Sequence, residues 1–411
     1  MKILLVTGNY LPGKNGGIEN YTHWLATILM QNNFDVQVAA LHVNEQATYF
    51  YEGIKVNYLE DRFANFEKLL AKERYTICHF HEYSAYGGIE IPWIEKAKQH
   101  CKKVFFTFHL PYLTCHKNDF RYMGVSDCNT FNNPQRCSEC VIADKVGYKN
   151  NLLSTIILKT VIGIMSISGK KKSLEKRITK NYANLDKLIA NCDNLFIYAD
   201  WFKNILNTNG YDSPKIIKIP YKTKSVVAGN VLKDSSIKNK ILFVGRIQHQ
   251  KGLHLLCKAM NEIETKNISL DVYGNIVDKA YFDNCVKDYS FNFKGTTNYL
   301  QLLEELKKYD FLVLPSVFTE MFSLIIKDAF YEQLPVIGSA AKGNKDAIKD
   351  GDNGFVFKYN SASDLAKTID KAYRLKFEGW KPVFSYNEKP ENDIREILSY
   401  YSISQQGFVL E

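Results

Sequence analysis

Residues 315–328 have the sequence PSVFTEMFSLIIKD, which places one carboxylate, Glu320, just before an apolar helix and a second, Asp328, within it. The preceding run, FLVLP at 311–315, predicts a buried strand. Unpaired backbone N–H groups at the start of such a helix attract anions. The groups expected to do so belong to Phe322, Ser323 and Leu324. The alternative is a carboxylate that caps the helix followed by one solvated Asp.

A second segment, ILFVGRIQHQKG at 241–252, predicts a buried strand that breaks at Gly245 into a loop with two cations. These cations are Arg246 and Lys251. A guanidinium offers a planar fork of donors and an ammonium offers a mobile point charge, so the pair suits a diphosphate. The pair would also stabilise a departing diphosphate as its charge grows. A solvated loop is the alternative interpretation.

Together the two segments resemble the second domain of the retaining, GT-B fold glycosyltransferases of family 4, also grouped as glycosyl transferases group 1. The shared patterns are Gly-Arg-x4-Lys-Gly after one strand and Pro-Ser-x3-Glu-x7-acid after the other. The resemblance implies that Arg246 and Lys251 bind the diphosphate of a UDP- or GDP-sugar donor. It implies that Glu320 binds the sugar and Asp328 the ribose. Because Asp328 replaces the usual Glu, a longer or water-mediated ribose contact is expected.

The first half of the chain carries matching signals. An apolar strand at 1–7 leads into a loop that ends in Gly16 and Gly17, where glycines let backbone approach a phosphate. A later apolar strand ends at His109, at the edge where open α/β sheets place ligands. In the resembled family the glycine pair faces the diphosphate and the histidine contacts the donor sugar. Residues 78–83 resemble the family's His-x-His strand end, on the acceptor side.

Strands that alternate with helices over 411 residues predict an α/β chain of two domains. The resemblance implies the GT-B arrangement, in which two Rossmann-like, doubly wound domains face each other across a cleft. The first domain is expected at 1–222, with a Cys-rich insert at about 115–140 and completion by a C-terminal helix at about 381–405. The donor domain is expected at 223–380.

The nine cysteines of the chain are expected to be thiols or metal ligands, because the start of the chain does not resemble a signal peptide. A cytoplasmic location follows from the same observation. Four cysteines are clustered, and the Cys-x2-Cys spacing of the last two allows a shared tetrahedral ion. This candidate structural zinc site consists of Cys115, Cys128, Cys137 and Cys140. Free thiols in a loop are the alternative.

The stretch 151–168 is apolar apart from Lys159 and is followed by a basic run at 169–177. Its central charge and its Ser and Gly residues argue against a transmembrane helix. The formal net charge of +9 favours a surface helix that meets anionic lipid at the inner face of the membrane. A lipid-linked saccharide acceptor would then be expected. The alternative is a helix packed in the first domain with a solvated basic end.

The expected activity is transfer of a sugar to an acceptor hydroxyl, in surface polysaccharide or glycolipid biosynthesis. No metal or other catalytic cofactor is expected, because Arg246 and Lys251 supply positive charge and the Asp-x-Asp at 350–352 has the composition of a turn. Two alternatives remain, a sugar-nucleotide epimerase of the same architecture and a donor-binding protein without activity. The basic segments lack the pattern of a nucleic-acid reader, so nucleic acid is not an expected partner.

Overall fold

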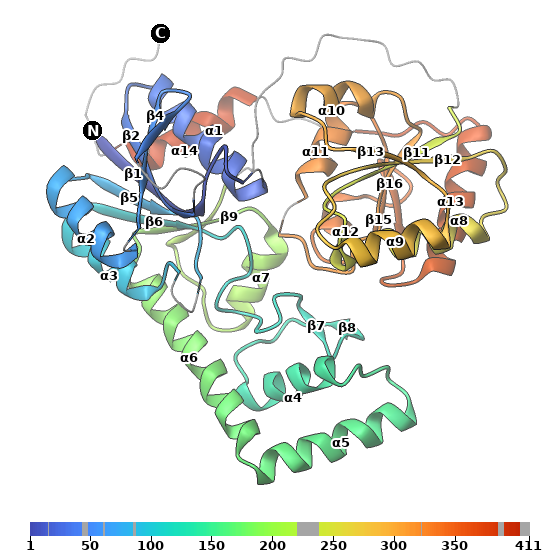
Figure 1. Cartoon of the computed structure of the whole chain (residues 1–411), viewed down its shortest axis with the longest axis horizontal. Coiled ribbons are helices and arrows are strands. Elements are labelled where there is room, and N and C mark those ends of the chain that lie inside the picture. Colours follow the sequence, from blue (N-terminus) through green and yellow to red (C-terminus); the bar gives the residue numbers. More distant parts are fainter. Residues whose placement is uncertain are drawn as a thin grey trace. The chain divides into compact units, whose positions relative to one another are not determined.

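The chain forms two compact units in a computed structural model (Figure 1). The first unit comprises Met1–Ser225 and Glu388–Glu411, and the second comprises Val226–Asn387. The structure describes residues 1–14, 16–42, 48–60, 62–84, 88–219, 238–321, 323–384 and 390–402. Each unit is an α/β domain built on its own sheet.

The first unit is built on a sheet with the strand order β10-β9-β6-β5-β1-β2-β4-β3. Neighbouring strands pair in parallel except for β3 and β4. The central strand β1 is buried over six consecutive residues, which is typical of a parallel strand covered on both faces. The strands are β1 (Lys2–Asn9), β2 (Asp35–His42), β3 (Tyr49–Tyr51), β4 (Ile54–Tyr58), β5 (Ile77–Phe80), β6 (Lys103–Thr107), β9 (Asn194–Ile197) and β10 (Ile216–Lys218).

The helices of the first unit include the last helix of the chain, α14, which packs back onto this sheet. Tyr401 of α14 is fully buried and its hydroxyl is hydrogen-bonded to Nδ1 of His79. The Tyr400 carbonyl accepts a bond of 3.2 Å from Lys103 Nζ. The helices are α1 (Gly17–Gln31), α2 (Arg62–Glu73), α3 (Ile91–His100), α4 (Pro134–Lys145), α5 (Leu152–Ile167), α6 (Lys170–Asn191), α7 (Asp200–Thr208) and α14 (Pro390–Tyr401).

The second unit has a parallel sheet with the order β13-β12-β11-β14-β15-β16. This is the doubly wound order, in which the chain reverses direction across the sheet between β11 and β14. Ligands bind such sheets at that switch point, beyond the carboxyl ends of the strands. The strands are β11 (Lys240–Val244), β12 (Ser269–Tyr273), β13 (Asn292–Gly295), β14 (Phe311–Leu314), β15 (Val336–Ser339) and β16 (Gly354–Phe357).

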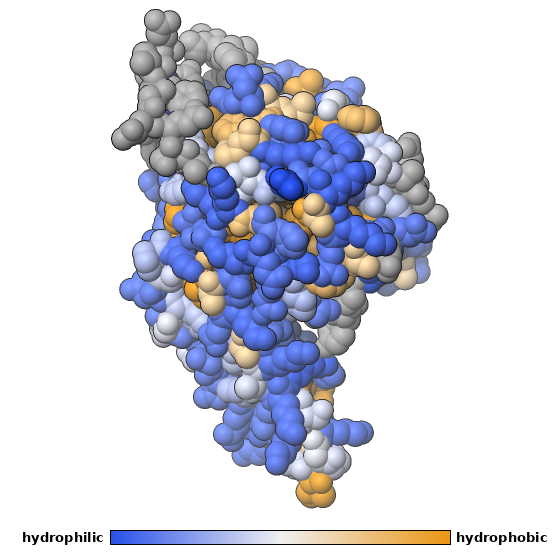
Figure 2. Space-filling model, turned by 90° about the vertical axis from the view of Figure 1, so that its left-hand side faces the viewer, coloured by the Kyte–Doolittle hydropathy of each residue, from blue (hydrophilic) through white to orange (hydrophobic). Residues whose placement is uncertain are grey.

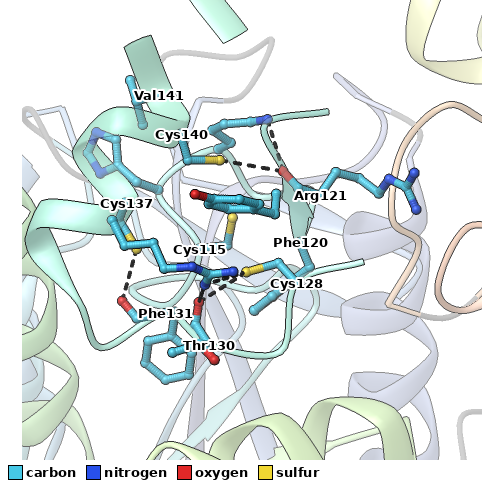
Figure 3. Close-up of a pocket in the computed structure, with 13 residues that line it drawn as sticks. Cys115, Phe120, Arg121, Cys128, Thr130, Phe131, Cys137, Cys140 and Val141 are labelled. Atoms are coloured by element: carbon cyan, nitrogen blue, oxygen red, sulfur yellow. Dashed lines mark hydrogen bonds between the residues drawn. The ribbon is translucent and has the colours of Figure 1, made fainter. Parts of the chain in front are cut away.

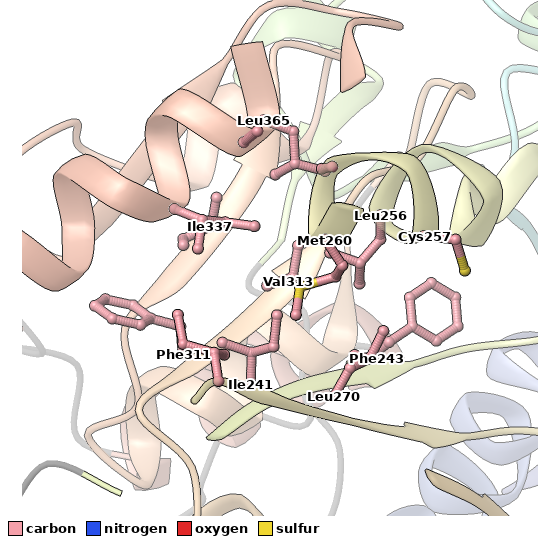
Figure 4. Packing of buried hydrophobic residues seen from close by; sticks show 14 of the residues in the cluster. Ile241, Phe243, Leu256, Cys257, Met260, Leu270, Phe311, Val313, Ile337 and Leu365 are labelled. Atoms are coloured by element: carbon pink, nitrogen blue, oxygen red, sulfur yellow. The ribbon is translucent and has the colours of Figure 1, made fainter. Parts of the chain in front are cut away.

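The core of the second unit lies on both faces of this sheet. Ile241 and Phe243 of β11 belong to one cluster, whereas Leu242 between them belongs to the other, as the two-residue period of a strand requires. Figure 4 shows the first cluster packed between the sheet and two helices, α8 and α13. The helices are α8 (Leu253–Glu262), α9 (Lys279–Asp288), α10 (Tyr299–Leu306), α11 (Leu324–Tyr331), α12 (Asn344–Ala347) and α13 (Ala362–Phe377).

Helices α4, α5 and α6 form a helical arm at one end of the first unit (Figure 1). Helix α6 packs through a row of buried residues, but α5 buries only Leu158. One side of α5 thus packs in the first unit, and basic residues that follow it, such as Lys170 and Lys172, are exposed. Among the residues described, no single helix is long and apolar enough to cross a membrane. The pair α5 and α6 passes the same test together but is bent by 86°.

A second, two-stranded sheet lies in the segment between β6 and α4. Its antiparallel strands are β7 (Arg121–Tyr122) and β8 (Ser126–Asp127). The guanidinium of Arg121 binds Asp127 Oδ1 at 2.6 Å and the Val125 carbonyl at 2.9 Å. The Cys-rich segment is therefore ordered by its own hairpin.

Candidate functional site

Two loops of the second unit lie side by side at the switch point of its sheet. One follows β11 and the other follows β14. The Val317 N–H donates to the Gln250 carbonyl at 2.9 Å, which ties them together. Gly252 has φ of +75°, and a Cβ at this position would stand 1.9 Å from the Pro315 carbonyl oxygen. The close approach of the loops therefore requires glycine here.

The predicted cation and carboxylate meet at this point. Lys251 Nζ forms an ion pair with Glu320 Oε1, and the two side chains are only 25% and 14% exposed. Ser316 Oγ lies 3.4 Å from the same carboxylate oxygen. The Glu320 N–H donates to the Lys342 carbonyl at 3.0 Å, and Gly343 leaves the space that the Glu320 carbonyl occupies. The carboxylate is thus held in place from both its side chain and its backbone.

Arg246 lies two residues beyond the end of β11, and its side chain is exposed. No hydrogen bond or ion pair joins it to another residue in the described ranges. The preceding residue is Gly245. A Cβ added at Gly245 would lie 3.7 Å from Cδ of Lys251. The loop therefore carries both an exposed guanidinium and an ammonium that is already paired, and both groups can bind an anion.

Helix α11 begins at Leu324, with Ser323 as its N-cap residue, whereas the sequence predicts a start near Phe322. Phe322 lies outside the described residues. The Ser323 side chain makes no capping hydrogen bond, and its carbonyl accepts from the Ile326 N–H at 3.1 Å. The Ser323 side chain therefore does not occupy the backbone N–H groups at the start of α11.

Asp328 is buried on α11 and accepts a hydrogen bond of 2.9 Å from the Tyr299 hydroxyl of α10. Burial raises the pKa of the Asp328 carboxyl from 3.8 to about 7, and the Tyr299 bond opposes this shift. Sequence analysis missed Tyr299, because one tyrosine at a helix start carries no motif. The Asp328 carboxyl is therefore supported by a phenol hydroxyl and titrates near neutral pH.

In the first unit, the glycine loop after β1 ends at α1 as expected. Gly16 is the N-cap residue of α1, and a Cβ there would stand 2.5 Å from Oε2 of Glu19. Glu19 is buried and lies 3.7 Å from Lys14 Nζ. Gly17, the first residue of the helix, is exposed. The loop is thus shaped around a buried carboxylate that the sequence analysis did not single out.

His109 lies just beyond β6 in a buried cluster of histidines. Its Nε2 is 3.2 Å from Nδ1 of His81, and the His79 ring packs against that of His81 at 4.2 Å. Burial lowers the pKa of His109 to about 3 and holds those of His79 and His81 well below the ordinary value. These imidazoles are therefore neutral and act as hydrogen-bonding groups.

Glu82 follows β5, the neighbour of β1, and therefore lies at the switch point of the first sheet. Its Oε2 accepts a bond of 2.9 Å from the Gly8 N–H. A Cβ at Gly8 would stand 2.3 Å from the same oxygen. Burial raises the pKa of the Glu82 carboxyl. The signal in the sequence was a glycine near the end of the first strand, which was not interpreted.

The four clustered cysteines line a single pocket (Figure 3). Each sulfur points to an oxygen atom instead of a shared centre. The distances from the sulfur atoms are 3.8 Å to Asp119, 3.1 Å to Thr130, 3.2 Å to Phe131 and 3.6 Å to Arg121, for Cys115, Cys128, Cys137 and Cys140 in that order.

Burial raises the pKa of Cys115 to about 12 and also raises those of Cys137 and Cys140, which favours neutral thiols. Across the described residues, no three His, Cys, Asp or Glu side chains are arranged to hold a metal ion. Metal ligation requires thiolates around one centre. The structure brings the cysteines together but does not arrange them as the predicted zinc site.

Residues 230–388 match the family model described as "Glycosyl transferases group 1". The second unit is a group 1 glycosyltransferase domain. Two uncharacterized glycosyltransferases of Methanocaldococcus jannaschii are 29% and 26% identical over 40% and 50% of this chain. The chain spans about half the length of these relatives, 43% and 57%. An uncharacterized 42.6 kDa protein from the cps region of Klebsiella pneumoniae is 23% identical over 84% of this chain and 86% of its own length.

Solved structures show that the whole chain has the GT-B fold. Sucrose-phosphate synthase from Thermosynechococcus elongatus aligns with a TM-score of 0.61 and 15% identity over 97% of this chain and 98% of its own. HepE of Anabaena, in complex with UDP, aligns with a TM-score of 0.57 and 12% identity over 98% and 99%. The predicted fold class is therefore confirmed.

Proposed function

We propose that this chain transfers a sugar from a nucleotide diphosphate donor to an acceptor hydroxyl, with retention of the anomeric configuration. The Lys251–Glu320 ion pair carries the proposal, because it lies at the switch point of a group 1 glycosyltransferase domain. A cation beside a carboxylate suits a ligand in which a diphosphate adjoins a sugar. Arg246 adds an exposed cation on the same loop.

Each candidate site residue of the second unit has a proposed role. Arg246 and Lys251 bind the diphosphate and stabilise it as it leaves, which is where negative charge grows. Glu320 accepts hydrogen bonds from the transferred sugar. When the diphosphate binds, Lys251 exchanges part of its contact with Glu320 for phosphate oxygens, which its three N–H donors permit.

The remaining contacts of the second unit are with the nucleotide. The start of α11, at Ser323 and Leu324, supplies N–H groups to the phosphates. Asp328, held by Tyr299, binds the ribose hydroxyls. A carboxylate accepts hydrogen bonds from two adjacent hydroxyls, which suits the ribose diol.

The first unit is proposed to supply uncharged groups. His109 is neutral, so it can donate a hydrogen bond to a sugar hydroxyl while its other nitrogen accepts from the protein. Gly16 and Gly17 are proposed to let backbone approach the phosphates. No protein nucleophile is assigned, and the donor's own phosphate is proposed to accept the proton of the acceptor hydroxyl.

We propose a UDP- or GDP-sugar as donor and a step in surface polysaccharide or glycolipid biosynthesis at the cytoplasmic side of the membrane. Proteins of the same fold are described in complex with UDP and glucose, and with UDP and N-acetylglucosamine. Others are described as lipopolysaccharide glycosyltransferases. The proposed reaction is metal-independent, because Arg246 and Lys251 supply the charge that a divalent ion would otherwise provide.

Calorimetric titration with UDP- and GDP-sugars, followed by product analysis, tests this proposal. Transfer predicts tight binding of one donor, slow release of nucleotide with water as acceptor, and a sugar product with the donor's anomeric configuration by NMR. Addition of EDTA should leave the rate unchanged. A converted sugar still attached to its nucleotide would instead indicate an epimerase. Binding without turnover, including with lipid-linked acceptors, would indicate a donor-binding protein.

A further inference from the structure

Helix α5 carries an exposed apolar stripe. Its exposed large hydrophobic side chains recur at spacings of one, three, four or seven residues, so they share one side of the helix. Leu158, the one buried residue, lies on the other side, which packs on the rest of the arm. The exposed residues are Leu152 (80%), Leu153 (69%), Ile156 (55%), Ile157 (45%), Ile164 (61%) and Ile167 (91%).

The polar groups of α5 do not interrupt this stripe. Thr160, which lies within it, donates its hydroxyl to the Ile156 carbonyl at 3.0 Å. Ser166 does the same to the Ile162 carbonyl at 2.7 Å. Hydroxyls that are satisfied inside the helix lose little when they leave water. Asn151 closes the start of the helix with a capping box. The stripe can therefore enter an apolar medium without stranding a donor.

Positive charge surrounds the stripe. Residues 145–180 contain nine Lys or Arg side chains and a single carboxylate, Glu175, although the whole chain has a formal net charge of only +9. Glu175 lies 3.8 Å from Lys171 Nζ, which is also 2.8 Å from Glu139. The exposed cations of this segment are Lys145, Lys149, Lys159, Lys170, Lys172, Lys176, Arg177 and Lys180.

The apolar stripe and the cations around it together favour one binding partner for this face of α5. A second copy of the chain would bring the same cations against themselves, which disfavours pairing. A membrane with anionic headgroups offers both an apolar layer for the stripe and negative charge for the Lys and Arg ring, whose long side chains reach the headgroups. Figure 2 shows hydrophobic surface at the lowest point of the projecting arm, amid hydrophilic surface.

We propose that the helical arm is a docking surface for anionic lipid, with the α5 stripe inserted at the headgroup boundary and the flanking cations on the lipid phosphates. A helix of 16 residues with cations at both ends suits a position along the interface. The inference goes beyond the sugar-transfer reaction and does not depend on it. It places the protein where a lipid-linked acceptor would be found.

Vesicle flotation without any sugar nucleotide tests the inference. The chain should float with vesicles that contain 30% phosphatidylglycerol, and the bound fraction should fall at least tenfold with pure phosphatidylcholine or in 0.5 M NaCl. The double variant Ile156→Glu/Ile164→Glu should lower binding to the anionic vesicles at least tenfold. A second variant, Lys170→Gln/Lys172→Gln/Lys176→Gln, should weaken binding and reduce its salt dependence.

Matched controls come from the second unit. Val277 and Phe377 are exposed to the same extent as the arm pair, at 53% and 58%. Val277→Glu/Phe377→Glu should leave vesicle binding unchanged, and circular dichroism should show that all variants are folded. The inference would be overturned if the arm and control variants lost vesicle binding equally. It would also be overturned if neither variant changed vesicle binding. So would a wild-type dimer, without vesicles, that Ile156→Glu/Ile164→Glu converts to a monomer.

Discussion

At the switch point of the second unit, between β11 and β14, the side chains are charged: Lys251 pairs with Glu320, and the loop that carries Lys251 also carries an exposed Arg246. At the switch point of the first unit, between β1 and β5, a cluster of buried imidazoles accompanies the Glu82 carboxyl. There His81 contacts His109, and burial keeps their imidazoles neutral.

Two sheets with similar winding thus present different chemistry at the same place. Parallel strands bring loop residues together at their carboxyl ends, but the residues themselves decide what is bound. The cations of the second unit suit phosphates, and the neutral imidazoles of the first unit suit sugar hydroxyls. Each prediction below alters one side of this comparison and leaves the other unchanged.

The largest effect is expected from Lys251→Ala, which removes the paired cation of the charged switch point. Loss of one positioned electrostatic donor costs roughly 100- to 1,000-fold in rate, so kcat/KM for sugar transfer should fall by about that factor. The control is Lys258→Ala, which removes an exposed Lys on α8 of the same unit. It should change kcat/KM by less than about twofold, because distant surface charges are screened. If both variants lost kcat/KM to a similar extent, the role assigned to Lys251 would be contradicted.

Gly252→Ala should loosen the contact between the two charged loops. The new Cβ would meet the Pro315 carbonyl at 1.9 Å, in a residue with φ of +75°. Strain and overlap together should lower local stability by about 3 kcal/mol. Gly210 has φ of +88° with no atom within 4 Å, so Gly210→Ala adds backbone strain alone, about 1 kcal/mol. Hydrogen exchange of the β11 and β14 amides measures the first effect. Equal effects at both glycines would contradict it.

The neutral histidines predict that acid weakens the first unit. Burial lowers the pKa of His109 to about 3, below its ordinary value of 6.5, so the unfolded chain binds a proton that the folded chain does not. The contribution of His109 to stability is therefore complete above pH 6.5 and is lost as pH falls, by about 1.4 kcal/mol at pH 5.5. His109→Asn should reduce the drop in Tm between pH 8 and pH 5.5. His100→Asn, at an exposed site on α3, should leave that drop as it is.

An effect of similar size but opposite sign belongs to the second unit. The pKa of Asp328 is raised to about 7, so the folded chain holds a proton that the unfolded chain has lost. Its contribution to stability is greatest at low pH and falls as pH rises through 7, by about 1.4 kcal/mol between pH 6 and pH 8. Asp328→Asn should flatten this part of the Tm profile. Asp352→Asn, at an exposed turn, should leave the Tm profile unchanged. A steeper decline in Asp328→Asn would contradict the assigned pKa.

The sequence predicted an α/β fold because its strands and strand-end loops are marked locally, and the resemblance of two of these loops to a known family implied the GT-B arrangement. A run such as Ile241–Val244 is apolar throughout, and a glycine follows it. The start of α11 was misplaced by two residues, since helix ends depend on capping geometry. The zinc prediction went further than spacing allows, because Cys spacing gives proximity along the chain and not the direction of each sulfur.

The sequence alone determined which residues follow each strand, and with them the cations and carboxylates available at each strand end. Tertiary structure decided which of these residues meet. Lys251 and Glu320 are 69 positions apart, and they form a pair because β11 and β14 are neighbours in the sheet. The contacts of Tyr299 with Asp328, Gly8 with Glu82, and His81 with His109 arise in the same way. Local patterns report interactions with near neighbours in the chain, whereas these contacts depend on strand order and helix packing.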